Sequence, residues 1–189
     1  MSSEIMSLEM DVFCLLLLIR ILYQMYINRE QNDHWNYFYY TIAWACVYLF
    51  MDAIWIMNVK HLLTFSKIQS GIFNSFYFCS LAMLVCSWYI YVQKTLHSAV
   101  LKHKKILVLT FIPLIFFIGS SLLSYWTHGL FVIDQAGNYH RGKLLPFYFF
   151  ILFAYILYLS IKAGYLSKKA KNYLYQNEYK VIVRFSFLP

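Results

Sequence analysis

Five long apolar blocks constrain the fold of this chain more than any other feature. Each is about 20 residues long, the length that an α-helix needs to cross the hydrocarbon core of a bilayer. Only helices and closed barrels satisfy their backbone hydrogen bonds in lipid, and these blocks are too long and continuous for barrel strands. The sequence therefore predicts an all-α fold, a polytopic bundle of transmembrane helices. The blocks run from Met10 to Ile27, Trp35 to Val59, Ile68 to Val92, Ile106 to Trp126 and Leu145 to Leu166.

The composition excludes a soluble domain. Hydrophobic residues make up 61% of the 189 residues and charged residues only 13%, which is about half the charge of a typical soluble domain. We therefore expect residues 1–189 to form a single membrane domain whose main partner is the lipid bilayer.

A sixth apolar segment runs from Val181 to Pro189 and is less than half as long as a membrane span. Natural C-termini rarely fall inside an apolar segment, so we expect a chain truncated within a partial sixth span. A cytoplasmic output domain beyond it would require seven spans in the whole protein, because six would leave that domain outside.

The basic residues predict the orientation in the membrane. The net charge of +8 arises mostly in short loops between apolar blocks, which is typical of a membrane protein and not of a nucleic-acid-binding one. The N-terminal segment before the first block has acidic residues but no Lys or Arg, so it is not a signal peptide. The positive-inside rule then places the N-terminus outside and two lysine-rich loops in the cytoplasm. These loops contain Lys94, Lys102, Lys104, Lys105, Lys168, Lys169, Lys171 and Lys180.

No residue pattern indicates a catalytic centre, a metal site or a cofactor. The four cysteines lie inside apolar blocks without a C-x-x-C pair, so we interpret them as small buried side chains. The six histidines form no H-E-x-x-H motif and no pair at helical spacing. We expect no enzymatic activity in this chain.

Arg20 and Asp52 are charged residues inside predicted spans, and such residues are candidates for a functional role. Counted from the outer side both lie roughly 10–12 Å deep, but counted from the cytoplasmic side they differ by about 15 Å. An ion pair between them is one interpretation. A purely structural pair, or an Arg20 side chain that reaches back to the headgroups, is the other.

The loop between the fourth and fifth blocks predicts a small β-hairpin on the outer face. Residues 131–133 are β-prone, residues 134–137 suit a turn with Asp first and Gly fourth, and residues 138–141 return. An isolated hairpin is marginal in water, so it should pack against the helix ends. It would form a lid over an outer pocket with Asp134, His140 and Arg141 as polar groups, unless it is a plain connector.

The same loop resembles the multi-span N-terminal sensor domains of many Firmicute-type diguanylate cyclases, the GGDEF proteins. Those domains have a pattern Phe-x-Ile-Asp-x-x-x-x-Tyr-x-Arg-Gly between two spans, and a Leu-Leu-Asp-x-x-Trp pattern in an earlier one. The first is met at Phe131, Ile133, Asp134, Tyr139, Arg141 and Gly142, and the second resembles the region of Asp52 and Trp55. The segment 183–189 resembles the start of their sixth span.

The resemblance implies a sensory module in a bacterial plasma membrane that controls a cytoplasmic GGDEF domain, sometimes with an EAL domain. A signal would pass through the last helix to a cytoplasmic homodimer. The stimulus would be an unidentified extracytoplasmic or membrane-borne ligand. Its candidate ligand-binding residues are Asp134, Tyr139, His140, Arg141, Asp52, Trp55 and Arg20.

Other functions remain open from the sequence. The sensor of a membrane histidine kinase has similar multi-span architecture and a different output. A small transporter fragment is a further alternative, although clear inverted repeats and broken helices are missing. The missing motifs argue against an integral membrane enzyme.

Overall fold

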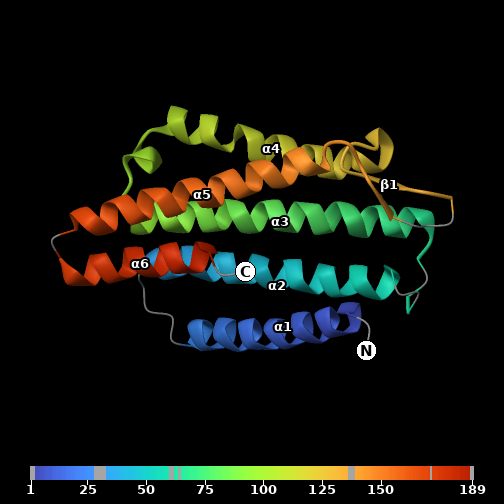
Figure 1. Cartoon of the computed structure of the whole chain (residues 1–189), viewed down its shortest axis with the longest axis horizontal. Helices are drawn as coiled ribbons and strands as arrows, with labels where there is room; N and C mark the ends of the chain where they lie inside the picture. Colours follow the sequence, from blue (N-terminus) through green and yellow to red (C-terminus); the bar gives the residue numbers. More distant parts are fainter. Residues whose placement is uncertain are drawn as a thin grey trace.

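The computed structural model describes residues 3–27, 33–59, 62–63, 65–135, 139–170 and 172–187. These residues form a helix bundle whose axes run roughly parallel and antiparallel to one another (Figure 1). The helices are α1 (Ser3–Ile27), α2 (Asp33–Val59), α3 (Lys67–Thr95), α4 (Lys104–Thr127), α5 (Leu145–Lys169) and α6 (Tyr173–Phe187), with a 3-10 helix η1 (Ala99–Lys102) and strands β1 (Phe131–Ile133) and β2 (Tyr139–Arg141). The predicted all-α bundle is confirmed.

Five of the helices are long and apolar enough to cross a membrane, and they coincide with the five predicted blocks within a few residues. The candidate spans are Leu8–Ile27, Asn36–Asn58, Lys67–Thr95, Lys105–Thr127 and Leu145–Lys169. The chain is accordingly a membrane protein by the length and composition of its helices.

The helix α3 is the centre of the bundle. It packs against α2 on one side and against α4 and α5 on the other, while α1 contacts only α2 among the well-packed helix pairs (Figure 1). None of the hydrophobic span in α1 is buried inside the protein, whereas 39% of the span in α3 is. The helix α1 is thus a peripheral element that presents most of its surface to lipid.

The helix α6 begins eight residues earlier than the apolar segment predicted at Val181. It starts at Tyr173 and returns along α5, and its Tyr179 and Ile182 are buried with Leu159 and Ala163 of α5. The start of this helix is not a continuous apolar segment, and the sequence therefore did not predict it. The polar residues there are Gln176, Asn177, Glu178 and Lys180. One buried face, rather than an apolar length, holds this helix in place.

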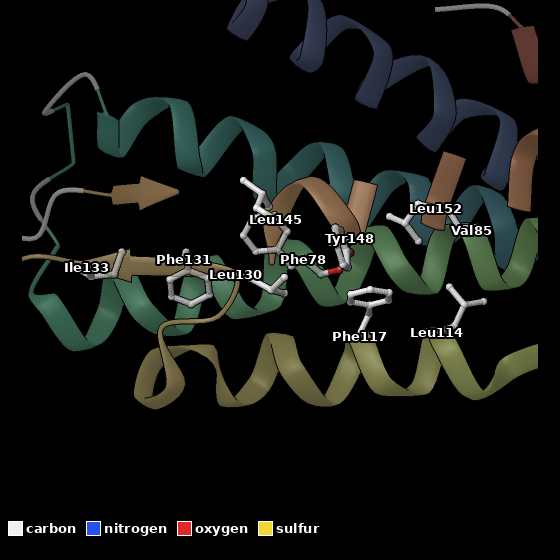
Figure 2. Close-up of a cluster of buried hydrophobic side chains, with 10 residues drawn as sticks. All are labelled: Phe78, Val85, Leu114, Phe117, Leu130, Phe131, Ile133, Leu145, Tyr148 and Leu152. Atoms are coloured by element: carbon white, nitrogen blue, oxygen red, sulfur yellow. The ribbon is translucent and has the colours of Figure 1, made fainter. Parts of the chain in front are cut away.

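The two ends of the bundle differ, and we name them by their contents. The hairpin end carries β1, β2 and the start of α3, and the lysine end carries η1 and the connection from α5 to α6 (Figure 1). Each end has its own core cluster. Rings of Phe78, Phe117 and Tyr148 dominate the first, which Figure 2 shows between the helices next to β1. Tyr89 and Tyr179 belong to the second.

Candidate functional site

The hairpin forms as predicted between α4 and α5. Strands β1 and β2 are antiparallel, with Phe131 opposite Arg141, Val132 opposite His140 and Ile133 opposite Tyr139. The predicted turn at 134–137 lies partly outside the described residues, which resume at Tyr139.

Backbone contacts fix the hairpin to the end of α4. The Ser124 hydroxyl accepts hydrogen bonds from the backbone amides of Leu130 at 2.8 Å and Phe131 at 3.1 Å. The amide of Gly142 donates to the carbonyl of Leu130 at 2.9 Å. A Cβ atom on Gly142 would lie 2.2 Å from the carbonyl oxygen of Gly129, so only glycine permits this close approach of two backbone segments. The glycine of the sensor-like pattern therefore has a structural role here.

Two further residues of that pattern also belong to the core. Phe131 and Ile133 point from β1 into the bundle and are 0% and 4% exposed. The Phe131 ring stacks on Phe78 of α3, with 6.0 Å between ring centroids (Figure 2). Because their side chains are covered by packed rings, they hold the hairpin against α3 and cannot meet a ligand directly.

The remaining aromatic residue of the pattern joins the hairpin to α2 and α3. The ring of Tyr139 meets Trp55 edge-on, with centroids 5.9 Å apart. Trp55 in turn stacks on Tyr77, with centroids 6.4 Å apart and planes 19° from parallel. The hydroxyl groups of Tyr77 and Tyr48 lie 3.2 Å apart and share a hydrogen bond. Trp55 and Tyr139, which belong to the two different sensor-like sequence patterns, are thus in contact in the structure.

Asp52 lies at the inner end of this chain of rings. Its carboxyl group makes side-chain hydrogen bonds with the hydroxyl of Tyr77 and with the carboxyl of Asp11 on α1. Carboxyl groups in contact repel each other when both are charged, so this pair disfavours a doubly ionised state. We call Asp11, Tyr48, Asp52, Trp55, Tyr77 and Tyr139 the hairpin-end cluster.

The structure does not bring Arg20 into this cluster. Asp52 pairs with Asp11, and Arg20 lies on the exposed face of α1, about 13 Å further along that helix. The depths of Arg20 and Asp52 counted from the cytoplasmic side, which differ by about 15 Å, therefore agree better with the structure than the depths counted from the outer side. Asp11 was missed because it lies at the edge of the first apolar block, although it is nearly as far from the end of α1 as Asp52 is from the end of α2.

Asp134, His140 and Arg141 lie on the solvent side of the hairpin. The His140 ring nitrogen Nε2 is 3.3 Å from the carboxylate of Asp134, and their side chains are 61% and 36% exposed. Arg141 is exposed. Burial raises the pKa of Tyr139, and the nearby Arg141 opposes that effect, so the phenol is neutral near pH 7. The hairpin therefore presents a polar outer face and one aromatic contact to the bundle.

A second polar group lies at the lysine end. The ammonium of Lys162 on α5 donates to the side chain of Gln93 on α3 and to the hydroxyl of Ser98, both at 2.6 Å. Gln93 is fully buried. No pattern in the sequence indicates this group, because the two partners of Lys162 lie more than 60 residues away in the chain.

In the part of the chain that the structure describes, no three His, Cys, Asp or Glu side chains come together as ligands for a metal ion. What the hairpin-end cluster offers is aromatic surface, hydroxyl groups and a carboxyl pair, held by three helices and one hairpin.

Comparison with known proteins does not identify a family. No family model, curated protein or solved structure matches this chain. The likeness to diguanylate cyclase sensor domains therefore depends on the quoted residues alone, and the established class is that of a membrane protein built as a helix bundle with a small hairpin.

Proposed function

We propose that this chain is the membrane sensory domain of a bacterial signalling protein and that it controls a cytoplasmic diguanylate cyclase. The hairpin end faces the outside in this proposal, in keeping with the positive-inside rule. The hairpin acts as the lid of an input site, and the lysine end passes the response to the output domain.

The observation that carries the proposal is the continuous contact from the hairpin to three helices. Tyr139 of β2 touches Trp55 of α2, which stacks on Tyr77 of α3. Tyr77 contacts Asp52, and Asp52 holds Asp11 of α1. A ligand that displaces Tyr139 thereby alters the contacts of α1, α2 and α3 together, and a shift between two bundle states requires such differential contacts.

The lysine end supplies a route toward the cytoplasm. The helix α6 packs on α5 and on the end of α3 through Tyr179 and Ile182, in one cluster with Tyr89 and Leu159. The same α3 carries Tyr77 three turns earlier. A rotation or translation of α3 would therefore change the surface on which α6 packs. The helix α6 is the last in the chain, so it would connect the bundle to an output domain.

The decisive experiment is to sequence the gene beyond codon 189 and express the complete reading frame. A GGDEF domain downstream, with formation of cyclic di-GMP that changes in a Trp55→Ala variant, would support the proposal. Trp126→Ala is the matched control, because this tryptophan at the end of α4 is 71% exposed and lies outside the hairpin-end cluster. A kinase domain would instead favour a sensor kinase, and a stop codon directly after Pro189 would contradict an output domain.

A transporter fragment is the second candidate, and the carboxyl pair is the observation that favours it. Carboxyl groups inside a bilayer that hold a proton recur in proton-coupled transporters. Proton flux into vesicles that contain this chain, abolished by Asp52→Asn, would support that function over signalling. Absence of flux above empty vesicles would dismiss it.

A further inference from the structure

Three buried polar side chains of α3 have an atom without a hydrogen-bond partner in the described residues: Ser70 and Asn74 at the hairpin end, and Gln93 at the lysine end. Ser70 and Asn74 lie one turn apart, and their exposed fractions are 1% and 2%. The amide nitrogen of Asn74 donates to the carbonyl of Ser70 at 2.7 Å, which fixes the orientation of the amide. The Asn74 Oδ1 and the Ser70 Oγ are left unpaired. Each unpaired buried polar atom destabilises a protein, so such a pair indicates a missing partner.

Helix geometry places these atoms at the seam between α2 and the hairpin. Residues 70, 74, 77 and 78 share one face of α3, because they are spaced by whole turns. Tyr77, one turn after Asn74, stacks on Trp55 of α2. Phe78, also one turn after Asn74, stacks on Phe131 of β1. Asn74 lies between the directions of Tyr77 and Phe78 on the helix, so it faces the seam between α2 and the hairpin.

The groups around this seam share one chemical preference. The Asn74 oxygen only accepts hydrogen bonds, and the Ser70 hydroxyl is able to accept them as well. The rings of Trp55, Tyr77 and Tyr139 offer faces that attract cations. The carboxyl groups of Asp11 and Asp52, which contact Tyr77 through Asp52, favour a positive over a negative charge in this region. The nearest cation on the hairpin, Arg141, is exposed to solvent.

We propose that this seam binds a small primary ammonium group between α2, α3 and the hairpin. Its N–H groups donate to Asn74 Oδ1 and Ser70 Oγ, and its charge lies against the aromatic rings. Entry requires Tyr139 to separate from Trp55, which is the motion that the lid function needs. The inference rests on the proposed sensory function because it names the ligand class of the same site.

The test is direct binding of n-propylammonium to the purified chain in neutral lipid nanodiscs. Equilibrium dialysis with radiolabelled probe measures the affinity, and the fluorescence of Trp55 reports the site in a variant whose other tryptophans are replaced by phenylalanine. We expect saturable binding that is at least about tenfold weaker in Asn74→Leu, since a hydrogen bond to a charged group is lost. Tetramethylammonium has the same charge without N–H groups and should bind at least about tenfold more weakly than the primary amine.

Two controls distinguish a loss of amine binding from a loss of folded structure. Asn74→Leu removes an unpaired acceptor and should leave the melting temperature unchanged or higher, so loss of binding is not loss of structure. Ser160→Ala is the matched control for Ser70→Ala, because Ser160 is a buried serine whose hydroxyl already donates to Ile156 at 2.9 Å. Ser70→Ala should weaken binding and Ser160→Ala should not.

Three outcomes would overturn the inference: no saturable binding to the wild type, as expected of a site that holds only water; equal affinity for tetramethylammonium; or unchanged affinity in Asn74→Leu. The proposed function fails differently. Binding of the amine without any effect on the output of the full-length protein would leave the site in place and reject the sensory function. An output that responds to another cue, without amine binding, would do the reverse.

Discussion

The two ends of the bundle hold neighbouring elements together by different kinds of contact. At the hairpin end, contacts to the backbone fix the geometry: the short side chain of Ser124 accepts hydrogen bonds from two backbone amides, and Gly142 lies against the backbone of Gly129. At the lysine end, one flexible side chain, Lys162, joins α5 to α3 and to the turn after it. Backbone contacts permit few alternatives, whereas a lysine side chain has many rotamers.

The chemical character of the ends differs as well. At the hairpin end the unpaired buried atoms are oxygens of Asp11, Ser70 and Asn74, whereas at the lysine end the unpaired atom is the amide nitrogen of Gln93. At the lysine end an ammonium supplies donors to neutral acceptors. We conclude that the hairpin end is a rigid frame suited to cationic or N–H-bearing groups, and that the lysine end is the more adaptable of the two.

The largest effect should come from Gly142→Ala, which tests the rigidity of the hairpin end. The added Cβ would lie 2.2 Å from the Gly129 oxygen, so the hairpin must move and its contacts with Ser124 are lost. We expect a loss of about 3 kcal/mol or more in the free energy of unfolding, measured by SDS titration in mixed micelles. Gly119→Ala on α4 is the control, because nothing lies within 4 Å of its added Cβ. Equal effects of the two changes would contradict a backbone-fixed hairpin.

Replacing Lys162 by methionine tests the lysine end. The change leaves Gln93 and Ser98 without their donor, and we expect a loss of about 1–3 kcal/mol. Hydrogen exchange should increase at the ends of α3 and α5 and remain unchanged in the hairpin. Lys169→Met is the control: its ammonium lies over the Tyr165 ring at 4.4 Å at the end of α5, and its loss should cost about 0.5 kcal/mol. Increased exchange in the hairpin would show that the two ends are not independent.

The sequence predicted the frame better than the site, and the reason is physical. Apolar length marks spans because lipid excludes unpaired backbone, and the turn residues at 134–137 mark the hairpin. The pairing of Asp52 was not predictable from its own helix. It depends on which helix lies beside α2 and in what register, so Arg20 was considered as its partner and Asp11 was missed. The unpaired atoms of Ser70 and Asn74 likewise follow from burial, which a pattern of apolar residues does not reveal.

Asp11→Leu tests whether the carboxyl pair holds α1 in the frame of the hairpin end. The hydrophobic span of α1 has no buried residue, and polar contacts between membrane helices contribute about 1 kcal/mol. We expect the distance between spin labels on α1 and α2 to broaden in Asp11→Leu. Asp11→Asn keeps a hydrogen bond to Asp52 and should preserve the wild-type distance distribution. Broadening in both variants alike would contradict the view that a hydrogen bond between Asp11 and Asp52 holds α1 in place.

The smallest expected effect concerns the single aromatic contact between the hairpin and α2. Tyr139 and Trp55 meet edge-on at 5.9 Å, and such a pair contributes about 0.5–1.5 kcal/mol beyond its buried area. A double-mutant cycle with Tyr139→Leu and Trp55→Leu isolates this coupling from the burial of each ring. A lid that opens for a ligand requires a coupling near the lower end of that range, because a stronger contact would hold the hairpin closed. A coupling above about 2 kcal/mol would make the hairpin a fixed part of the frame, and the input would then have to reach α3 by another route.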